Sequence, residues 1–150
     1  ATPTLLKAQL VKPFYKAQAT AIGGRTGSAA SADGNLRVRF ATPNELKGNG
    51  GNGTNPEQLF AAGYAGSFLS AIKLVASQEK IAVANDSNVT ATVAVSPNDQ
   101  GEGFALSVSL AIDLPGVEAA TARRLVDAAH AICPYSNAIH GNVTVGFSIA

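Results

Sequence analysis

Two side chains of this 150-residue sequence could carry nucleophilic or redox chemistry, and they lie far apart in the chain. Ser67 stands in the apolar stretch AAGYAGSFLSAI (61–72), and Cys133, the single cysteine, stands in HAICPYSN (130–137). A serine attacks substrates when a base activates it, and a cysteine reacts as its thiolate. Ser67 lacks the G-x-S-x-G elbow after a strand, and an isolated cysteine is most often a small buried apolar residue. These residues alone favour a ligand-binding or structural domain.

Two further patterns could bind a ligand, but neither is complete. The glycine-rich stretch GNGGNGTN (48–55) lacks the Lys-Ser/Thr pair of a phosphate-binding loop, so a flexible connector is the simpler interpretation. His130, Cys133 and His140 supply three possible metal ligands, but helical spacing puts His130 on the polar side of its helix, away from Cys133. We therefore expect neither a metal nor a cofactor.

Composition indicates one soluble globular domain spanning residues 1–150. The chain is 46% hydrophobic with a net charge of +1, which gives no electrostatic footprint for nucleic acid or for acidic membranes. No signal peptide is recognisable, and one cysteine excludes an internal disulfide framework, so we expect a reducing, cytoplasmic setting. Residues 59–76 are apolar enough to suggest a membrane span. Polar and glycine interruptions favour a buried core helix instead.

The elements that would position these residues follow from periodicity. Alternation of period two predicts strands around 36–40, 89–95, 104–112 and 143–149, with a weaker candidate at 14–22 and a turn-rich loop at 23–34. Asn55 followed by Pro56 predicts the start of a long apolar helix. A second helix is expected over about 117–133, ended by Pro134. The resulting order of strands, helix, two strands, helix and strand indicates an α+β fold.

The second predicted helix has two distinct faces. Its apolar stripe comprises Leu125, Val126, Ala129, Ile132 and Cys133. Arg123, Asp127 and His130 fall on the opposite, solvated face, where Arg123 and Asp127 are one turn apart and can pair. Cys133 is therefore expected at the inner face of a helix end.

Two long motifs, GTNPEQLFAAGYAGSFLSAIK (53–73) and AHAICPYSNAIHGNV (129–143), closely resemble the organic hydroperoxide resistance (Ohr) proteins of the Ohr/OsmC family. TAIGGRTGSAASADG (20–34) resembles the arginine loop of that family, and the similarity extends over nearly the whole chain after about Tyr15. The resemblance implies intertwined homodimers with antiparallel sheets around a long apolar central helix plus a second helix. It also implies thiol-dependent reduction of organic hydroperoxides, such as alkyl or fatty-acid hydroperoxides, with a lipoyl-type dithiol as reductant.

Carried over by resemblance, Arg25 and Glu57 match the residues that assist the attacking thiol, and Cys133 matches the resolving cysteine. Ser67 occupies the position of the peroxidatic cysteine, so this chain is expected to be inactive as a peroxidase. Either the serine was introduced or a natural member has lost its thiol, and the retention of Arg25 and Glu57 favours the first. The expected substrate pocket comprises Phe60, Tyr64, Phe68 and Leu69. A non-enzymatic relative that binds hydrophobic ligands is the alternative.

Helix geometry raises one question about these residues. Glu57 and Ser67 are ten positions apart, which corresponds to about 15 Å along a straight helix. Both could serve one arginine only if the helix breaks near Gly63, or if Glu57 and Arg25 reach Ser67 of the other protomer. The intertwined dimer implied by the resemblance favours the second arrangement.

Overall fold

The computed structural model describes residues 11–150, and the chain forms two compact units, Ala1–Asn55 and Pro56–Ala150. The predicted α+β class is confirmed, because both units contain a three-stranded sheet and the second adds three α-helices. The single domain over residues 1–150 stays a prediction.

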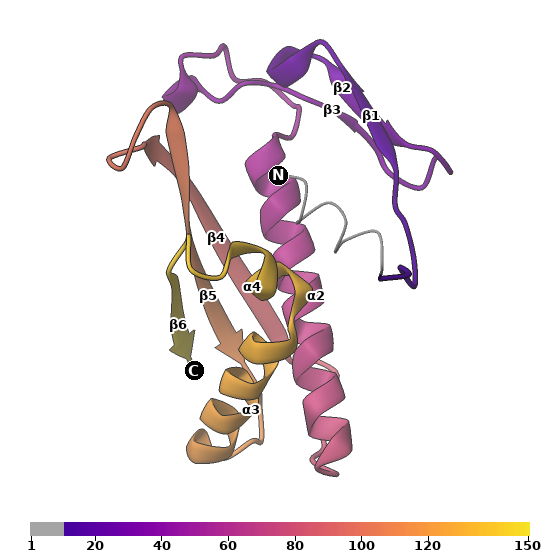
Figure 1. Ribbon diagram of the computed structural model, residues 1–150, viewed down its shortest axis with the longest axis vertical. Helices are drawn as coiled ribbons and strands as arrows, with labels where there is room; N and C mark the ends of the chain where they lie inside the picture. The colour runs from indigo at the N-terminus through magenta and orange to yellow at the C-terminus, as the bar shows by residue number, and fades with distance from the viewer. Residues whose placement is uncertain (1–10) are drawn as a thin grey trace. The chain divides into compact units, whose positions relative to one another are not determined.

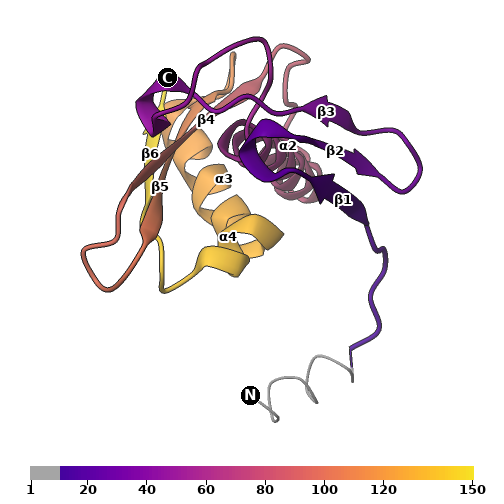
Figure 2. The ribbon, with the colours of Figure 1, turned by 90° about the horizontal axis from the view of Figure 1, so that it is seen from above.

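The first unit is a small antiparallel sheet of order β1-β2-β3, formed by β1 (Ala19–Ile22), β2 (Ser28–Ser31) and β3 (Arg37–Arg39) (Figure 2). Two short 3-10 helices, η1 (Gly24–Thr26) and η2 (Asn44–Leu46), complete it. The predicted strand at 14–22 forms only over its last four residues. The prediction of a loop at 23–34 was wrong, since this segment contains η1 and β2. Residues Ser28–Ser31 are small and show no hydrophobic alternation, and they form a strand because they pair with β1.

The second unit contains α2 (Pro56–Gln78), β4 (Asn88–Pro97), β5 (Phe104–Asp113), α3 (Ala119–Ile132), α4 (Pro134–Ile139) and β6 (Val145–Ile149). Strands β4 and β5 form an antiparallel hairpin, as predicted, with α2 lying along the sheet (Figure 1). The expected antiparallel pairing is found for β1-β2-β3 and for β4-β5, whereas β6 pairs with β5 in parallel. The helical connection through α3 and α4 returns the chain to the starting end of β5, and such a crossover is what parallel pairing requires.

One face of the β4-β5-β6 sheet, α2 and α3 enclose the core of the second unit. Alternate residues of β5 point into it, as the period-two pattern predicted, and Val108, Leu110 and Ile112 are buried. The pattern fails at Phe104, which begins β5 beside the hairpin loop and is 79% exposed. The largest fully buried apolar side chains are Tyr64, Phe68, Ile72, Leu110, Ile112, Leu125 and Val126.

Helix α2 begins at Pro56, as predicted, and continues without interruption to Gln78. The alternative of a break near Gly63 is therefore wrong. Among residues 11–150 it is the one helix long and apolar enough to cross a membrane by length and composition, a test that core helices of soluble proteins also pass. Its buried residues, among them Tyr64, Phe68 and Ile72, pack in the core of the second unit, which identifies it as a core helix.

The end of α3 differs from the expectation in three respects. Pro134 does not end the helical segment but occupies the first position of α4, where its missing N–H costs nothing. Cys133 has an extended backbone and redirects the chain, so Ile132 faces outward and is 44% exposed instead of buried. His130 is half-buried rather than solvated, because α4 folds back beside it. The Arg123–Asp127 pair is confirmed, with Nε and Oδ1 3.5 Å apart on the surface.

Apolar surface left uncovered in both units predicts an obligate homodimer. In the described part of the first unit, Phe40 is the one buried hydrophobic side chain, while Ile22 is 73% exposed, so this sheet has hardly a core of its own. In the second unit, only 33% of the apolar window of α2 is buried, and Leu74 is 52% exposed. Surfaces of this kind are covered by a partner in stable proteins, and the proposed partner is a second copy of the chain.

Sedimentation equilibrium at micromolar concentration is expected to give twice the chain mass of 15.2 kDa. Leu74→Glu should weaken association at least about tenfold, since it places a charge in the covered face. Lys73→Glu, on an already polar exposed position, is the matched control. The monomer mass for the unmodified protein would refute the prediction.

Candidate functional site

Ser67 and Cys133 meet in the second unit although they are 66 positions apart in the sequence. The Ser67 Oγ lies 3.6 Å from the Cys133 Sγ, a distance at which either atom can act as donor. Ser67 is carried by the middle of α2, and Cys133 lies at the junction where α3 ends and α4 begins. Cys133 is completely buried and Ser67 is half-buried, so the pair lies at the edge of the core.

A wall of aromatic rings extends from this pair along α2. Tyr64 is fully buried and stacks on Tyr135 with ring centroids 5.6 Å apart. Phe60 meets both rings edge-on, at 6.1 Å from Tyr64 and 5.9 Å from Tyr135. Phe68 continues the row from Tyr64. The expected pocket residues Phe60, Tyr64 and Phe68 are therefore adjacent, whereas Leu69 is half-buried and lies outside the core cluster.

Tyr135 was not predicted as a pocket residue, and the absence of a side chain at Gly63 makes room for it. A Cβ atom at position 63 would lie 2.5 Å from the Tyr135 hydroxyl oxygen, too close for any real contact. Tyr135 is itself 36% exposed, whereas the Tyr64 ring on which it stacks is fully buried. The signal for it in the sequence was its place in CPYSN, directly after the cysteine.

A buried hydrogen-bond chain joins the three helices around Cys133. The Ser136 hydroxyl, 2% exposed, lies 2.6 Å from the Tyr64 hydroxyl and 2.8 Å from Nδ1 of His130. Burial raises the pKa of Tyr64 above its ordinary value, the Ser136 bond opposes the shift, and proximity to Cys133 adds to it, so the phenol is neutral at physiological pH. Sequence reasoning missed Ser136 and placed His130 in solvent because it did not anticipate α4.

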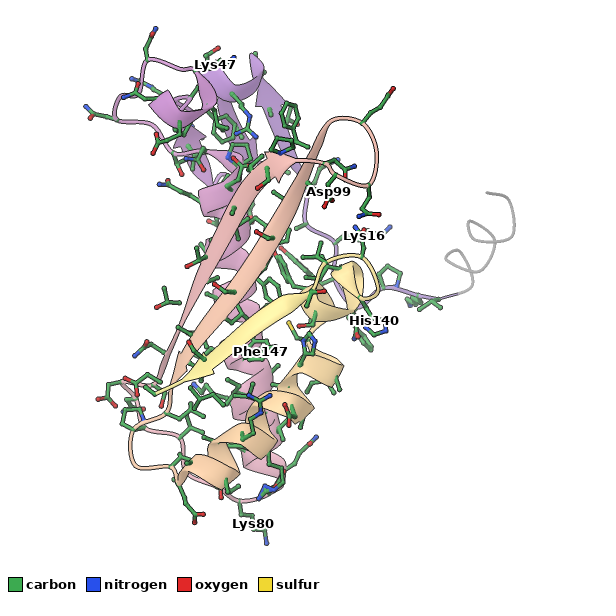
Figure 3. All side chains as sticks on the ribbon, turned by 90° about the vertical axis from the view of Figure 1, so that its left-hand side faces the viewer. Lys16, Lys47, Lys80, Asp99, His140 and Phe147 are labelled. Atoms are coloured by element: carbon green, nitrogen blue, oxygen red, sulfur yellow. The ribbon has the colours of Figure 1, made fainter. Side chains whose placement is uncertain are left out.

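His130 is also held by a second contact. Its ring lies edge-on to Phe147 of β6, with centroids 5.0 Å apart (Phe147 is labelled in Figure 3). Among residues 11–150 no group of three or more His, Cys, Asp or Glu side chains is arranged to hold a metal ion. His140 caps the far end of α4, and the three ligands considered from the sequence form no such group.

The two assisting residues taken from the resemblance belong to different units. Arg25 lies in η1 of the first unit, is half-buried, and its carbonyl accepts a hydrogen bond from the Thr42 hydroxyl at 3.2 Å. Glu57 lies in the first turn of α2 and is half-buried. Because α2 is continuous, Glu57 stands about 15 Å along the axis from Ser67 of the same chain. Their assisting roles stay predictions.

A groove of about 600 Å³ with a mixed polar and apolar lining lies beside the aromatic wall. It runs between the β4–β5 hairpin loop and the α4–β6 connection, and Phe60 lines both the groove and the wall. Its other apolar lining residues are Phe104, Ala105, Leu106, Val108, Ile139 and Val143, and its polar lining residues are Asn98, Asp99, Gln100, Ser107, Asn142 and Thr144. Phe60 therefore connects this groove to the row of rings that continues along α2 toward Ser67.

Complete burial predicts that Cys133 reacts slowly with thiol reagents. Its side chain is completely buried and its sulfur lies beside the Ser67 hydroxyl, so a reagent must wait for local opening. Iodoacetamide in native buffer at neutral pH is expected to modify it at least about a hundredfold more slowly than in denaturant. Fast stoichiometric modification of the native protein would contradict the prediction.

The fold and this site define a class: an α+β protein with an apolar central helix whose middle residue faces a buried cysteine at a helix junction. A family model described as OsmC-like protein matches residues 48–148. The organic hydroperoxide resistance protein of Xanthomonas axonopodis pv. citri is 47% identical over 139 residues, covering 93% of this chain and 96% of that protein. The chain belongs to the OsmC-like family, as the sequence motifs indicated.

Other relatives agree with this assignment. The organic hydroperoxide resistance protein OhrA of Bacillus subtilis is 40% identical over 140 residues, covering 93% of this chain and 98% of that protein. The crystal structure of an organic hydroperoxide resistance protein from Legionella pneumophila superposes with a TM-score of 0.87 at 46% identity, covering 93% and 99% of the two chains. A Vibrio cholerae relative, described with captopril bound in one of its active sites, gives 0.85 at 46% identity, covering 93% and 94%.

Proposed function

We propose that this chain is the scaffold of an organic hydroperoxide peroxidase in which a serine occupies the attacking position. The observation that carries the proposal is the 3.6 Å approach of the Ser67 hydroxyl to the buried Cys133 thiol, in a chain whose relatives include proteins named for organic hydroperoxide resistance. A sulfur at position 67 would have its resolving partner already beside it. With serine at position 67, the chain holds the resolving thiol and the surrounding pocket but lacks the sulfur atom that attacks peroxide.

The chemistry of peroxide reduction by a pair of thiols explains why a serine at position 67 prevents the reaction. A thiolate attacks one peroxide oxygen, the O–O bond breaks, the alcohol leaves, and the sulfur becomes a sulfenic acid. A second thiol then displaces water to form a disulfide, which an external dithiol reduces. A hydroxyl has a pKa far above that of a thiol and has no sulfenate state. Ser67 therefore permits neither step.

Arg25 and Glu57 are proposed to prepare the attacking sulfur. A cysteine on apolar α2 would have its pKa raised by desolvation, and a guanidinium nearby would oppose that by favouring the thiolate. Glu57 would hold the guanidinium in a two-pronged pair. Since α2 is unbroken, the separation of about 15 Å between Glu57 and Ser67 of its own chain supports catalysis across the dimer, with both residues acting on the partner subunit's Ser67 position.

The proposed substrates are hydroperoxides with an apolar body, such as alkyl or fatty-acid hydroperoxides. The aromatic wall formed by Phe60, Tyr64, Phe68 and Tyr135 and the groove of about 600 Å³ that begins at Phe60 support this class. The reductant is proposed to be a lipoyl-type dithiol, from the family resemblance. A cytoplasmic location is proposed from the single free cysteine.

The proposal is tested by hydroperoxide consumption in the presence of a dithiol. The unmodified chain should consume cumene hydroperoxide no faster than its Cys133→Ser variant, because one buried thiol without an attacking partner adds nothing measurable. Robust turnover by the unmodified chain would overturn the assignment of Ser67 to the attacking position.

Binding of an apolar ligand without chemistry is the second candidate, and the aromatic wall favours it equally. It predicts saturable binding of a long-chain fatty acid by the unmodified chain together with an inert Ser67→Cys variant. The activity of that variant therefore separates the two functions.

A further inference from the structure

We infer that Ser136 is a positioning residue that holds the Cys133 sulfur against position 67, through hydrogen bonds to Tyr64 and His130; the inference rests on the proposed function. Nothing in the proposed chemistry uses these three side chains directly. Tyr64 and Ser136 are nevertheless buried, at 0% and 2% exposed, His130 is half-buried, and the three side chains come from the three helices that meet around Cys133.

The spacing of the contacts is the first argument. Tyr64 meets Ser136 and Ser67 meets Cys133, so α2 and the α3–α4 junction share two polar contacts, three residues apart along both segments, in addition to the ring contacts of Tyr135. The order of the partners is reversed along the two segments: Tyr64 precedes Ser67 on α2, whereas its partner Ser136 follows Cys133. With the Ser67–Cys133 contact alone, the α3–α4 junction could rotate about that contact. The Tyr64–Ser136 bond restrains this rotation and so sets how closely the sulfur can approach position 67.

The second argument is the closure around Cys133. His130 lies three residues before it and Ser136 three residues after it, and the 2.8 Å bond between them spans the turn at which Cys133 leaves the helical conformation. Backbone bonds support the same turn, from Cys133 N–H to the Ala129 carbonyl at 2.8 Å and from Asn137 N–H to the Cys133 carbonyl at 2.9 Å. The side-chain bond fixes the angle between α3 and α4, and with it the direction of the thiol.

The third argument is hydrogen-bond accounting. One arrangement uses both hydroxyl hydrogens: Tyr64 donates to Ser136, and Ser136 donates to Nδ1 of His130. Removing the Ser136 hydroxyl leaves the fully buried Tyr64 hydroxyl without this partner, which is costly in the core. The α3–α4 junction would then shift away from the position that the Ser136 bonds impose.

The step that needs this positioning is disulfide formation. In the Ser67→Cys variant, the Cys133 sulfur attacks the sulfenic sulfur at position 67, an S–S bond forms, the S–O bond breaks, and the thiol proton leaves with the hydroxyl as water. The sulfur of Cys133 is oxidised and the sulfenic sulfur is reduced. A misplacement of about 1 Å can slow such a step about a hundredfold, while attack on the peroxide, made at position 67, does not use Cys133.

The test compares Ser67→Cys with Ser67→Cys/Ser136→Ala after addition of excess cumene hydroperoxide. Mass spectrometry follows three products at position 67: free thiol, disulfide to Cys133, and sulfinic acid, which accumulates when resolution is slow. We expect equal rates of thiol loss in both variants, with disulfide formation at least about tenfold slower and sulfinic acid dominant when Ser136 is absent. Ser148→Ala, an exposed serine on β6, is the matched control and should behave like the parent.

Loss of stability is separated from loss of positioning by a third variant, Ser67→Cys/Tyr64→Phe/Ser136→Ala. Removing both hydroxyls eliminates the unsatisfied group, so the melting temperature should recover toward that of the parent while disulfide formation stays slow. The inference would be overturned if the triple variant recovered both its melting temperature and its rate of disulfide formation. An unchanged disulfide yield in Ser67→Cys/Ser136→Ala would overturn it as well. Free thiol at position 67 after peroxide treatment of Ser67→Cys itself would instead overturn the proposed function.

Discussion

The Ser67→Cys variant is expected to reduce organic hydroperoxides at least about a thousandfold faster than the unmodified chain, because loss of an attacking nucleophile commonly costs that much or more. The physical reason is that one atom changes while its surroundings are kept. The introduced sulfur would face Cys133, whose Sγ already lies 3.6 Å from the serine oxygen, and the aromatic wall would remain in place.

Two measurements check this result. Consumption of cumene hydroperoxide with dihydrolipoamide as reductant gives the rate, and peptide mass spectrometry after one equivalent of peroxide should show positions 67 and 133 cross-linked. The Ser70→Cys variant, one helical turn away on the exposed side of α2, is the matched control and should give neither turnover nor this cross-link. An inert Ser67→Cys variant with free thiols would favour the ligand-binding alternative.

Removing the Arg25 guanidinium in the Ser67→Cys background is expected to slow peroxide reduction at neutral pH by about threefold to thirtyfold. An opposite charge within about 4–6 Å shifts a pKa by about 1–3 units, and its loss raises the thiol pKa. A higher thiol pKa reduces the fraction of thiolate at neutral pH, by about tenfold for each pKa unit. A more basic thiolate is also a better nucleophile, and this recovers about half of the effect on a logarithmic scale.

The pH profile distinguishes this role from a structural one. In Arg25→Ala the rising limb of the rate should move to higher pH, and above both pKa values the variant should match or exceed its parent. Arg25→Lys should recover part of the shift, since it keeps the charge but loses the planar fork. Arg37→Ala, in β3 of the same unit and exposed, is the control. A uniform loss of rate at every pH would contradict the electrostatic role.

Local signals in the sequence predicted the elements that carry the site. The Asn55-Pro56 start of α2 and the alternation in β4 and β5 are local patterns, and the structure bears them out. The direction of β6 was missed, because parallel pairing depends on where α3 and α4 return the chain rather than on any property of residues 143–149. Strand β2 was missed for a similar reason, since Ser-Ala-Ala-Ser becomes a strand only through its neighbours.

The site was predictable to a different extent. Periodicity put Cys133 on the inner face of a helix end, which is correct, but gave no reason for it to meet Ser67; that expectation came from the resemblance to a family. Neither the periodicity of the sequence nor the family resemblance predicted the Tyr64–Ser136–His130 hydrogen-bond chain. It depends on α4, whose start at Pro134 looks in sequence like a helix end, because proline is compatible with both.

The closeness of Ser67 and Cys133 also bears on the unfolded chain. A covalent link between these positions would close a loop of 66 residues that contains the β4–β5 hairpin and all of α3. In the chain-entropy description, such a cross-link removes denatured-state freedom worth about 4 kcal/mol. The oxidised and reduced forms of a Ser67→Cys protein would then melt at clearly different temperatures, so that thermal stability itself would report the redox state of the pair.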